Sequence, residues 1–162
     1  MKLYFFRHGI AEDSQGPEFD DFARRLTDKG VERIEFAGAA LAKLGVKPTH
    51  LYSSPRVRAR QTADILAKAL NIAVTVREEV NFGFNNTLIE PLIATLTGED
   101  EVMFVGHEPD LSVTISVMIG GGAVEMRKGG VARVDLISHS PLRGTLVWVL
   151  TPKVMDVVAQ GS

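Results

Sequence analysis

The chain has 162 residues, of which 45% are apolar and 23% charged, a composition ordinary for one globular domain with a sizeable core. Its formal net charge of −2 gives no electrostatic footprint for binding a nucleic acid or an anionic membrane. The sequence contains no cysteine, which excludes disulfides, thiolate metal sites and cysteine nucleophiles. We therefore expect residues 1–162 to form a single domain.

The first strand is predicted over residues 2–6, a short run of apolar and aromatic residues that is typical of a buried strand. A long polar loop follows. Thr27 then precedes a helix whose apolar residues recur at helical spacing until Gly45 ends it. Because Met1 leads straight into the first strand without a signal peptide, we expect a cytoplasmic protein.

The second strand is predicted over residues 50–53. Ser54 is expected to cap the next helix, with Pro55 in the first turn, and this helix should end near Leu70. A third strand is predicted over residues 73–76. A turn-rich stretch then leads to a helix over residues 87–96.

The last third of the chain contains a fourth strand over residues 101–105 and a helix over 111–119 that is apolar on most sides, so we expect it to be buried. Residues 131–137 and 145–150 read as a hairpin connected through residues 141–144, and a short helix should follow from Lys153.

The alternation of strands and helices predicts an α/β fold with three layers. We expect a mainly parallel sheet with helices on both faces and a late antiparallel hairpin.

Ionisable side chains follow three of the predicted strands. The first strand ends in Arg7 and His8, the second leads into a helix that carries Arg58, and the fourth ends before His107. In an open α/β sheet, ligands bind beyond the carboxyl ends of the strands. We therefore expect these four side chains to face one site.

Helix geometry gives Arg58 a second reason to be functional. At 100° per residue, Arg58 shares a face with Thr62, Ile65 and Ala69, which should contact the sheet, whereas Ala67 falls on the solvent face. An arginine on a buried face needs a partner, because burying an unpaired charge is costly. A bound anion would satisfy it.

Two arginines and two histidines favour phosphoryl transfer. Arginine binds phosphate oxygens through two parallel hydrogen bonds, and neutral histidine is a nucleophile toward phosphorus. A second histidine, if cationic, adds charge where negative charge gathers in the transition state. No spacing of histidines and carboxylates predicts a metal site, and the glycine runs lack the lysine of a nucleotide-binding loop. We therefore predict metal-independent chemistry with no cofactor.

The same residues resemble the signature of the histidine phosphatase superfamily, also called the phosphoglycerate mutase-like family. Arg7-His8-Gly9 resembles its first motif, residues 54–63 its second, and Val105-Gly106-His107 its third. The stretches 25–30 and 106–112 are more specifically similar to the SixA-type branch, the protein phosphohistidine phosphatases.

The resemblance implies roles for individual residues. His8 would be the nucleophile that carries a phosphohistidine intermediate. Arg7 and Arg58 would hold the phosphoryl oxygens, and His107 would complete their pocket. Three further residues are implied beside the substrate: Arg25, Gly9 and Ser54. Gly9 is expected to let the backbone approach the phosphate closely, because it has no Cβ.

The general acid is the least defined role. Glu79 lies in a stretch that resembles the acid-bearing segment of the mutases, although the acidic and glycine residues that usually follow are missing. Glu12 and Glu108 are lesser candidates. A phosphohistidine substrate needs less acid assistance, because imidazole is a far better leaving group than an alkoxide.

The expected function is removal of phosphate from a phosphohistidine-bearing protein, such as a histidine-phosphotransfer domain or a phosphotransferase-system carrier. Two alternatives stay open: a phosphatase of small phosphate monoesters, and a module that binds phosphorylated partners without turnover. A mutase is less favoured. A monomer is the default expectation, with no nucleic acid and no membrane as partners.

Overall fold

The computed structural model describes residues 1–13 and 16–161 and contains one six-stranded sheet with the strand order β3–β2–β4–β1–β5–β6. The first four strands in the chain pair in parallel, and the last two form an antiparallel hairpin that joins the sheet beside β1. The strands are β1 (Lys2–Arg7), β2 (His50–Ser53), β3 (Val74–Val76), β4 (Glu101–Gly106), β5 (Val131–His139) and β6 (Leu142–Leu150).

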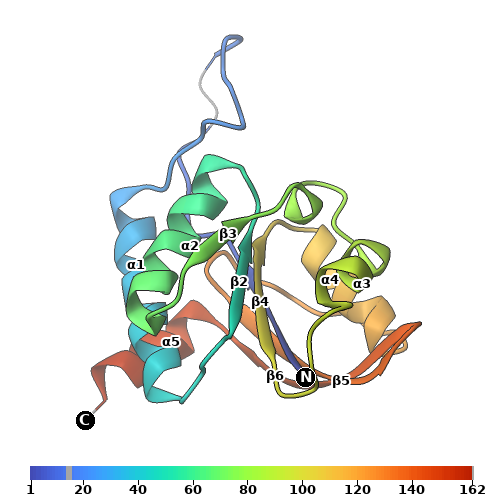
Figure 1. The fold of residues 1–162 in the computed structure, drawn as a ribbon. Helices are drawn as coiled ribbons and strands as arrows, with labels where there is room; N and C mark the ends of the chain where they lie inside the picture. Colours follow the sequence, from blue (N-terminus) through green and yellow to red (C-terminus); the bar gives the residue numbers. More distant parts are fainter. Residues whose placement is uncertain (14–15, 162) are drawn as a thin grey trace.

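Helices cover both faces of this sheet (Figure 1). One face carries α1 (Asp28–Lys43), α2 (Val57–Leu70) and α5 (Pro152–Gln160). The other carries α3 (Asn86–Ile93) and α4 (Asp110–Met118), and a short 3₁₀ helix, η1 (Glu78–Val80), precedes α3. The predicted three-layer α/β fold is therefore confirmed. In the described part of the chain, no helix has the length and apolarity needed to cross a bilayer.

The core lies on both sides of β1 and β4, because successive side chains of a strand point to opposite faces. Phe5 and Phe104 are fully buried under α3 and α4 and stack with ring centroids 5.6 Å apart. Phe6 is fully buried on the other face, in the layer shared with α1 and α2. Each large apolar side chain buried in this way stabilises the fold by about 1.5–3 kcal/mol. The central strands are thereby held firmly at the point where the functional side chains follow.

In three places the element boundaries differ from the sequence prediction by more than one residue. Helix α3 ends at Ile93, three residues before its predicted end. Helix α2 begins at Val57 with Arg56 as its N-cap residue, so Ser54 does not cap it. The hairpin strands continue further than predicted, and only Ser140 and Pro141 connect them. Backbone pairing extends the strands through polar residues that the hydrophobic pattern could not assign.

The predicted faces of two helices also need correction. The residues of α2 that pack on the core centre on Ala59, Ala63 and Leu66, each fully buried, and Ala67 is buried as well. Helix α4 is only half-buried, because its Val113 is 57% exposed. An apolar residue does not reveal by itself which face of a helix meets the sheet.

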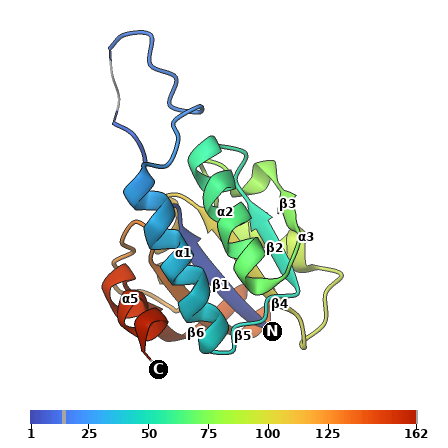
Figure 2. The same ribbon diagram turned by 90° about the vertical axis from the view of Figure 1, so that its left-hand side faces the viewer.

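Residues 10–13 and 16–27, which connect β1 to α1, extend beyond the carboxyl edge of the sheet before the chain returns (Figure 2). This segment stands next to the ends of β1 and β2, where the candidate site lies.

Candidate active site

The three strand ends singled out in the sequence are neighbours in the sheet, because β4 lies between β2 and β1. The His8 backbone N–H donates to the Gly106 carbonyl (3.1 Å), and the Ser54 N–H donates to the Val105 carbonyl (3.0 Å). The rings of His8 and His107 approach with centroids 5.3 Å apart. The structure thus brings together Arg7, His8, Arg58 and His107, which we call the strand-end cluster.

The protonation of His8 follows from its hydrogen bonds. Its Nδ1 lies 2.7 Å from the Gly9 carbonyl oxygen, which can only accept, so Nδ1 carries the ring proton. Nε2 therefore carries no proton, and its lone pair accepts a hydrogen bond from the Nε–H of Arg58 (3.3 Å). Burial, with help from the charges of Arg58 and Arg7, lowers the pKa of His8 to about 3. At neutral pH, His8 is an uncharged ring with a nucleophilic nitrogen.

Arg58 is buried with its charge facing the cluster, as the helix geometry suggested. One terminal nitrogen donates to the Asp21 carbonyl (2.8 Å), and the other lies 3.3 Å from the Asp21 carboxylate. Burial lowers the pKa of Arg58 and the Asp21 charge opposes this shift, so the guanidinium stays cationic. The partner that the buried arginine needs is thus an anionic group of the chain itself.

Arg7 is held by the turn that precedes β5. Its terminal nitrogen donates to the Met126 carbonyl (2.9 Å), and its Nε is buried without a hydrogen-bond partner among the described residues. The N–H of Gly129 bridges the carbonyls of Arg7 and His8, both at 3.0 Å. Gly129 adopts a φ of +78°, which favours glycine. The sequence showed this turn only as a glycine pair, but it fixes the backbone of the nucleophile.

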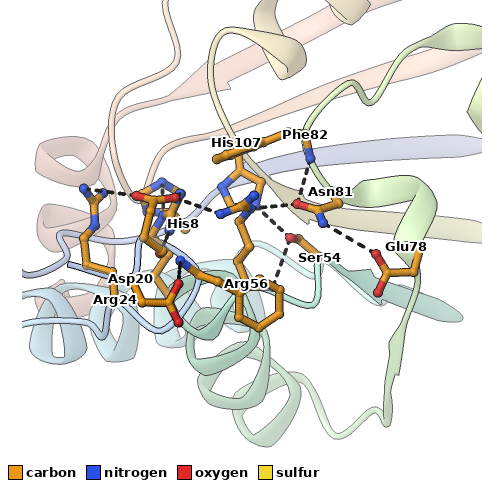
Figure 3. Close-up of polar contacts among 12 residues, drawn as sticks. His8, Asp20, Arg24, Ser54, Arg56, Glu78, Asn81, Phe82 and His107 are labelled. Atoms are coloured by element: carbon orange, nitrogen blue, oxygen red, sulfur yellow. Dashed lines mark hydrogen bonds and ion pairs between the residues drawn. The ribbon is translucent and has the colours of Figure 1, made fainter. Parts of the chain in front are cut away.

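His107 is neutral in the free protein, contrary to the cationic role considered from the sequence. Burial is the main cause that lowers its pKa to about 2, and the neighbouring His8 ring and the positive charges of Arg58 and Arg56 add to it. Its Nε2 lies 2.7 Å from Ser54 Oγ, a contact drawn in Figure 3. Because Ser54 Oγ already accepts from the Arg56 N–H, its own proton is available for Nε2. The ring proton then stands on Nδ1, a buried donor that lacks a partner within the described chain.

Ser54 therefore orients His107 instead of capping α2. Thr62 has a related role that the sequence did not reveal, since its hydroxyl donates to the Arg58 carbonyl (2.7 Å) and accepts from the Gly9 N–H (3.1 Å). It ties the helix that carries Arg58 to the turn that follows His8. The sequence indicated this role of Thr62 only by placing it on the same face of the helix as Arg58.

Sequence reasoning missed a second layer of charged residues around the cluster (Figure 3). Arg56 donates to the Asp21 carboxylate (2.8 Å) and to the Asn81 side-chain oxygen (2.8 Å). Its guanidinium lies over the Phe82 ring, 3.6 Å from the centroid. Arg24 lies 3.7 Å from the other Asp21 oxygen. The Asp21 carboxylate therefore stands among three arginines, in the manner of a bound anion.

Arg25 is exposed, and Arg24 takes the place next to the cluster that the sequence had assigned to Arg25. The charge of Arg24 lowers the pKa of both histidines, and its buried Nε has no partner in the part of the chain described. Two adjacent arginines point in different directions in an extended chain, so the motif alone could not distinguish them. Substrate binding by Arg25 stays a prediction that its exposure disfavours.

The rest of that motif has a structural explanation. The side chain of Thr27 caps α1 by accepting from the Gly30 N–H (3.0 Å), and its own N–H donates to the Ile10 carbonyl (3.0 Å). A Cβ on Gly30 would collide with that carbonyl oxygen. The motif thus fastens the start of α1 to the residues that follow His8, which places Arg24 beside the cluster.

Gly9 has a packing reason to lack a Cβ, and the close approach of a phosphate that the sequence suggested stays a prediction. A Cβ at this position would lie 2.9 Å from Ile34 and 3.3 Å from Leu26. Its backbone has the functional role, because its carbonyl fixes the tautomer of His8.

Glu79 does not have the environment of a general acid. Its carboxylate pairs with Arg77 (2.9 Å), and this hydrogen bond lowers the pKa of Glu79. A general acid needs a raised pKa to hold its proton at neutral pH. Glu12 is exposed, and Glu108 accepts from the Ser112 N–H (2.9 Å). The acid role of Glu79 remains a prediction, and its pairing with Arg77 argues against it.

Within residues 1–13 and 16–161, no three His, Asp or Glu side chains are grouped so as to hold a metal ion. What the cluster offers is an unprotonated histidine nitrogen surrounded by fixed positive charge and by donors that lack a partner among the described residues. This combination suits an attack on phosphorus, because the donors would bind the phosphoryl oxygens while Nε2 approaches.

Comparison with known proteins agrees with this geometry. The model of the histidine phosphatase superfamily (branch 1) matches residues 3–83. An uncharacterised protein of Picosynechococcus is 33% identical over 139 residues, which are 81% of this chain and 82% of the relative. The chain therefore belongs to the histidine phosphatase superfamily.

Two solved structures define the fold more closely. The protein histidine phosphatase SixA complexed with tungstate has a TM-score of 0.83 at 24% identity, covering 94% of this chain and 98% of that one. A putative phosphohistidine phosphatase SixA from Agrobacterium tumefaciens has a TM-score of 0.76 at 27% identity, covering 93% and 98%. The fold is thus that of the SixA-type branch, and the family and its neighbours support a phosphatase.

Proposed function

We infer that this protein removes phosphate from phosphohistidine in other proteins, through a covalent intermediate on His8. The observation that carries this inference is the fixed tautomer of His8, whose Nδ1–H is held by the Gly9 carbonyl while Nε2 keeps its lone pair. A residue that only bound phosphate would have no need of a neutral, free nitrogen at this place.

The reaction would proceed in two displacements. In the first, Nε2 of His8 forms a bond to phosphorus while the phosphorus–nitrogen bond of the substrate breaks. The leaving imidazole takes the bonding electrons and departs as a neutral ring when its other nitrogen is protonated. In the second, water attacks the phosphoryl group on His8, which releases inorganic phosphate and returns the free histidine.

Arg7, Arg58 and the Nδ1–H of His107 would bind the phosphoryl oxygens during both steps. Arg58 already directs its Nε–H toward Nε2 of His8, so it stands where the transferred group must pass. Donors fixed before the reaction stabilise the transition state without reorganising, and each such donor is worth about 10²–10³ in rate.

Two features favour a phosphohistidine protein over a small phosphate ester. The pairing of Glu79 with Arg77 disfavours this carboxylate as the acid that an alkoxide leaving group would require. In addition, Phe82 and Phe22 are 53% and 42% exposed, and both rings lie near the guanidinium of Arg56, next to the cluster. Exposed aromatic rings beside a site are typical of contact with a protein surface.

The test is phosphate release, without added metal, from a phosphohistidine protein, p-nitrophenyl phosphate and sugar phosphates. We expect a strong preference for phosphohistidine that is lost in His8→Ala. The exposed His139 provides a matched control, since His139→Ala should retain full activity. Preference for sugar phosphates would establish the small-ester alternative, and tight binding without release would establish a binding module.

A further inference from the structure

A second feature of the surface adjoins the strand-end cluster, and apart from Arg7 its residues have no part in the proposed chemistry. It is a cavity of about 530 Å³ that shares Arg7 with the cluster. We call it the basic pocket, and its lining consists of Arg7, Ile10, Lys29, Arg33, Arg127, Lys128 and Pro152. Five of these seven side chains are cationic, in a chain whose net charge is −2. Positive charge is therefore concentrated in this pocket, although the chain as a whole carries a net negative charge.

Little of this charge is neutralised within the chain. Arg33 pairs with Asp156 (2.7 Å). Among the described residues, Arg127 pairs with Glu125 alone, and both of those side chains are mostly exposed, so the pair contributes little. Lys29 and Lys128 are exposed and have no carboxylate within 4.0 Å among the described residues. The pocket thus keeps an excess of positive charge that an anionic partner would satisfy.

The pocket is anchored to the nucleophile through the backbone. Gly129, next to Lys128, donates to the carbonyls of Arg7 and His8, both at 3.0 Å. On the opposite wall, the first turn of α1 carries Lys29 and is fastened to Ile10 by the Thr27 N–H (3.0 Å). The basic pocket is therefore fixed relative to His8, and Arg7, which lines the pocket and belongs to the strand-end cluster, joins the two.

We propose that the basic pocket receives Asp and Glu side chains that lie beside the phosphohistidine on the protein substrate. This proposal rests on the proposed function and specifies the class of partner: a phosphoprotein with an acidic patch next to its phosphorylated ring. The cavity is many times the roughly 30 Å³ of one water, so it has room for several carboxylates. Its exposed lysines are flexible, which suits a protein surface better than the fixed recognition of one small ligand.

The expected effect is electrostatic steering of the partner. Complementary charge raises association rates by about 10–10³, and salt weakens the effect because exposed charges are screened. Acidic neighbours should therefore increase kcat/KM mainly at low ionic strength, while the chemistry at His8 is unchanged.

The experiment compares two synthetic phosphohistidine peptides, one flanked by Asp and Glu and the other by Ser and Gly. The test variant is Lys29→Glu with Lys128→Glu. The matched control, Lys47→Glu with Lys68→Glu, makes the same change in net charge at exposed positions that do not line the basic pocket. Hydrolysis of p-nitrophenyl phosphate by each protein reports whether the cluster is intact.

We expect the wild type and the control variant to prefer the acidic peptide by about tenfold in kcat/KM at low salt. The test variant should lose this preference and still hydrolyse p-nitrophenyl phosphate and the neutral peptide at the wild-type rate. Equal rates on both peptides in the wild type, or the same preference in the test variant, would overturn the proposal.

A failure of the proposed function gives a different result. If neither peptide is hydrolysed but p-nitrophenyl phosphate is, inhibition of that reaction by an unphosphorylated acidic peptide still decides the matter. Inhibition that disappears in the test variant supports an acidic protein partner, and its absence in the wild type refutes one. If the test variant instead loses only the binding of small bisphosphorylated esters, the pocket holds a second phosphate and the proposal is wrong.

Discussion

The Asp21 carboxylate should compete with the substrate for the arginines of the site, so the substitution Asp21→Asn should strengthen oxyanion binding. Its Oδ2 lies 2.8 Å from Arg56 and 3.3 Å from Arg58, and the side chain is 42% exposed. Partly exposed pairs of this kind contribute about 0.2–1 kcal/mol each, so freeing both arginines should gain about 1 kcal/mol, or roughly fivefold in affinity. The substitution should keep the shape of the site, because the backbone carbonyl of residue 21 also holds Arg58 (2.8 Å) and is unaffected.

The measurement is the inhibition constant of tungstate or phosphate against p-nitrophenyl phosphate hydrolysis, at low and high salt. Asp64→Asn is the control, since Asp64 is an exposed carboxylate paired with Arg60 (2.9 Å) on the outer face of α2. We expect about fivefold tighter inhibition in Asp21→Asn, a smaller gain at high salt, and no change in the control. Unchanged or weaker inhibition in Asp21→Asn would mean that the carboxylate helps to build the site and does not compete with its ligand.

Three further predictions concern the surroundings of the cluster. Arg24→Ala should weaken tungstate inhibition by about 10–100-fold, because hydrogen bonds to charged groups contribute about 1.5–3 kcal/mol. Arg25→Ala should change this inhibition less than twofold, because Arg25 is exposed. A larger effect of Arg25→Ala than of Arg24→Ala would show that Arg25 is the contact. Glu79→Gln should leave phosphohistidine turnover unchanged, and a large loss would revive its acid role. The pKa values of His8 and His107 are lowered to about 3 and 2, so between these values and about pH 6.5 the unfolded chain binds more protons than the folded protein. The free energy of unfolding, measured in urea, should therefore decrease as the pH is lowered through this range, by up to about 1.4 kcal/mol per pH unit for each histidine. His107→Asn should make this slope shallower, and an identical slope would contradict the lowered pKa.

The sequence predicted most of the fold because the buried strands are apolar on both faces. The run from Leu3 to Phe6 can only be a central strand, and the residue that follows such a strand in an open α/β sheet lies at the ligand-binding edge. His8 and His107 could therefore be placed in one site before any contact was known. Arg58 was found by the same reasoning, applied to a helix that begins at that edge.

The second layer of charge could not be predicted, because it depends on how a long polar segment folds back. Asp21 meets Arg56 and Arg58 across 35 and 37 residues of chain, and nothing in its local pattern indicates this. The position of Arg24 beside the cluster could not be predicted for a similar reason, because the direction of a side chain in an irregular segment is set by tertiary contacts. Substrate binding by Arg25 stays a prediction.

Local patterns also misled where two explanations fit the same residue. Ser54 before a proline reads as a helix cap, yet its hydroxyl is used by His107 (2.7 Å). Gly9 reads as room for a phosphate, and the structure adds a packing reason, because a Cβ there would contact Ile34. Glu79 resembles a family acid, and its pairing with Arg77 two residues earlier argues against that role, which stays a prediction. In each case a tertiary or neighbouring contact that is invisible in the motif itself bears on the role.

The central claim is that His8 is phosphorylated during turnover, and detection of the phosphoenzyme tests it most directly. The protein would be mixed with a phosphohistidine substrate, quenched at alkaline pH, where phosphohistidine survives, and digested for mass spectrometry. The account predicts a phosphoryl group on the peptide that contains His8, absent in His8→Ala and removed as inorganic phosphate is released. Phosphate release with no modified His8, or turnover that persists in His8→Ala, would contradict it.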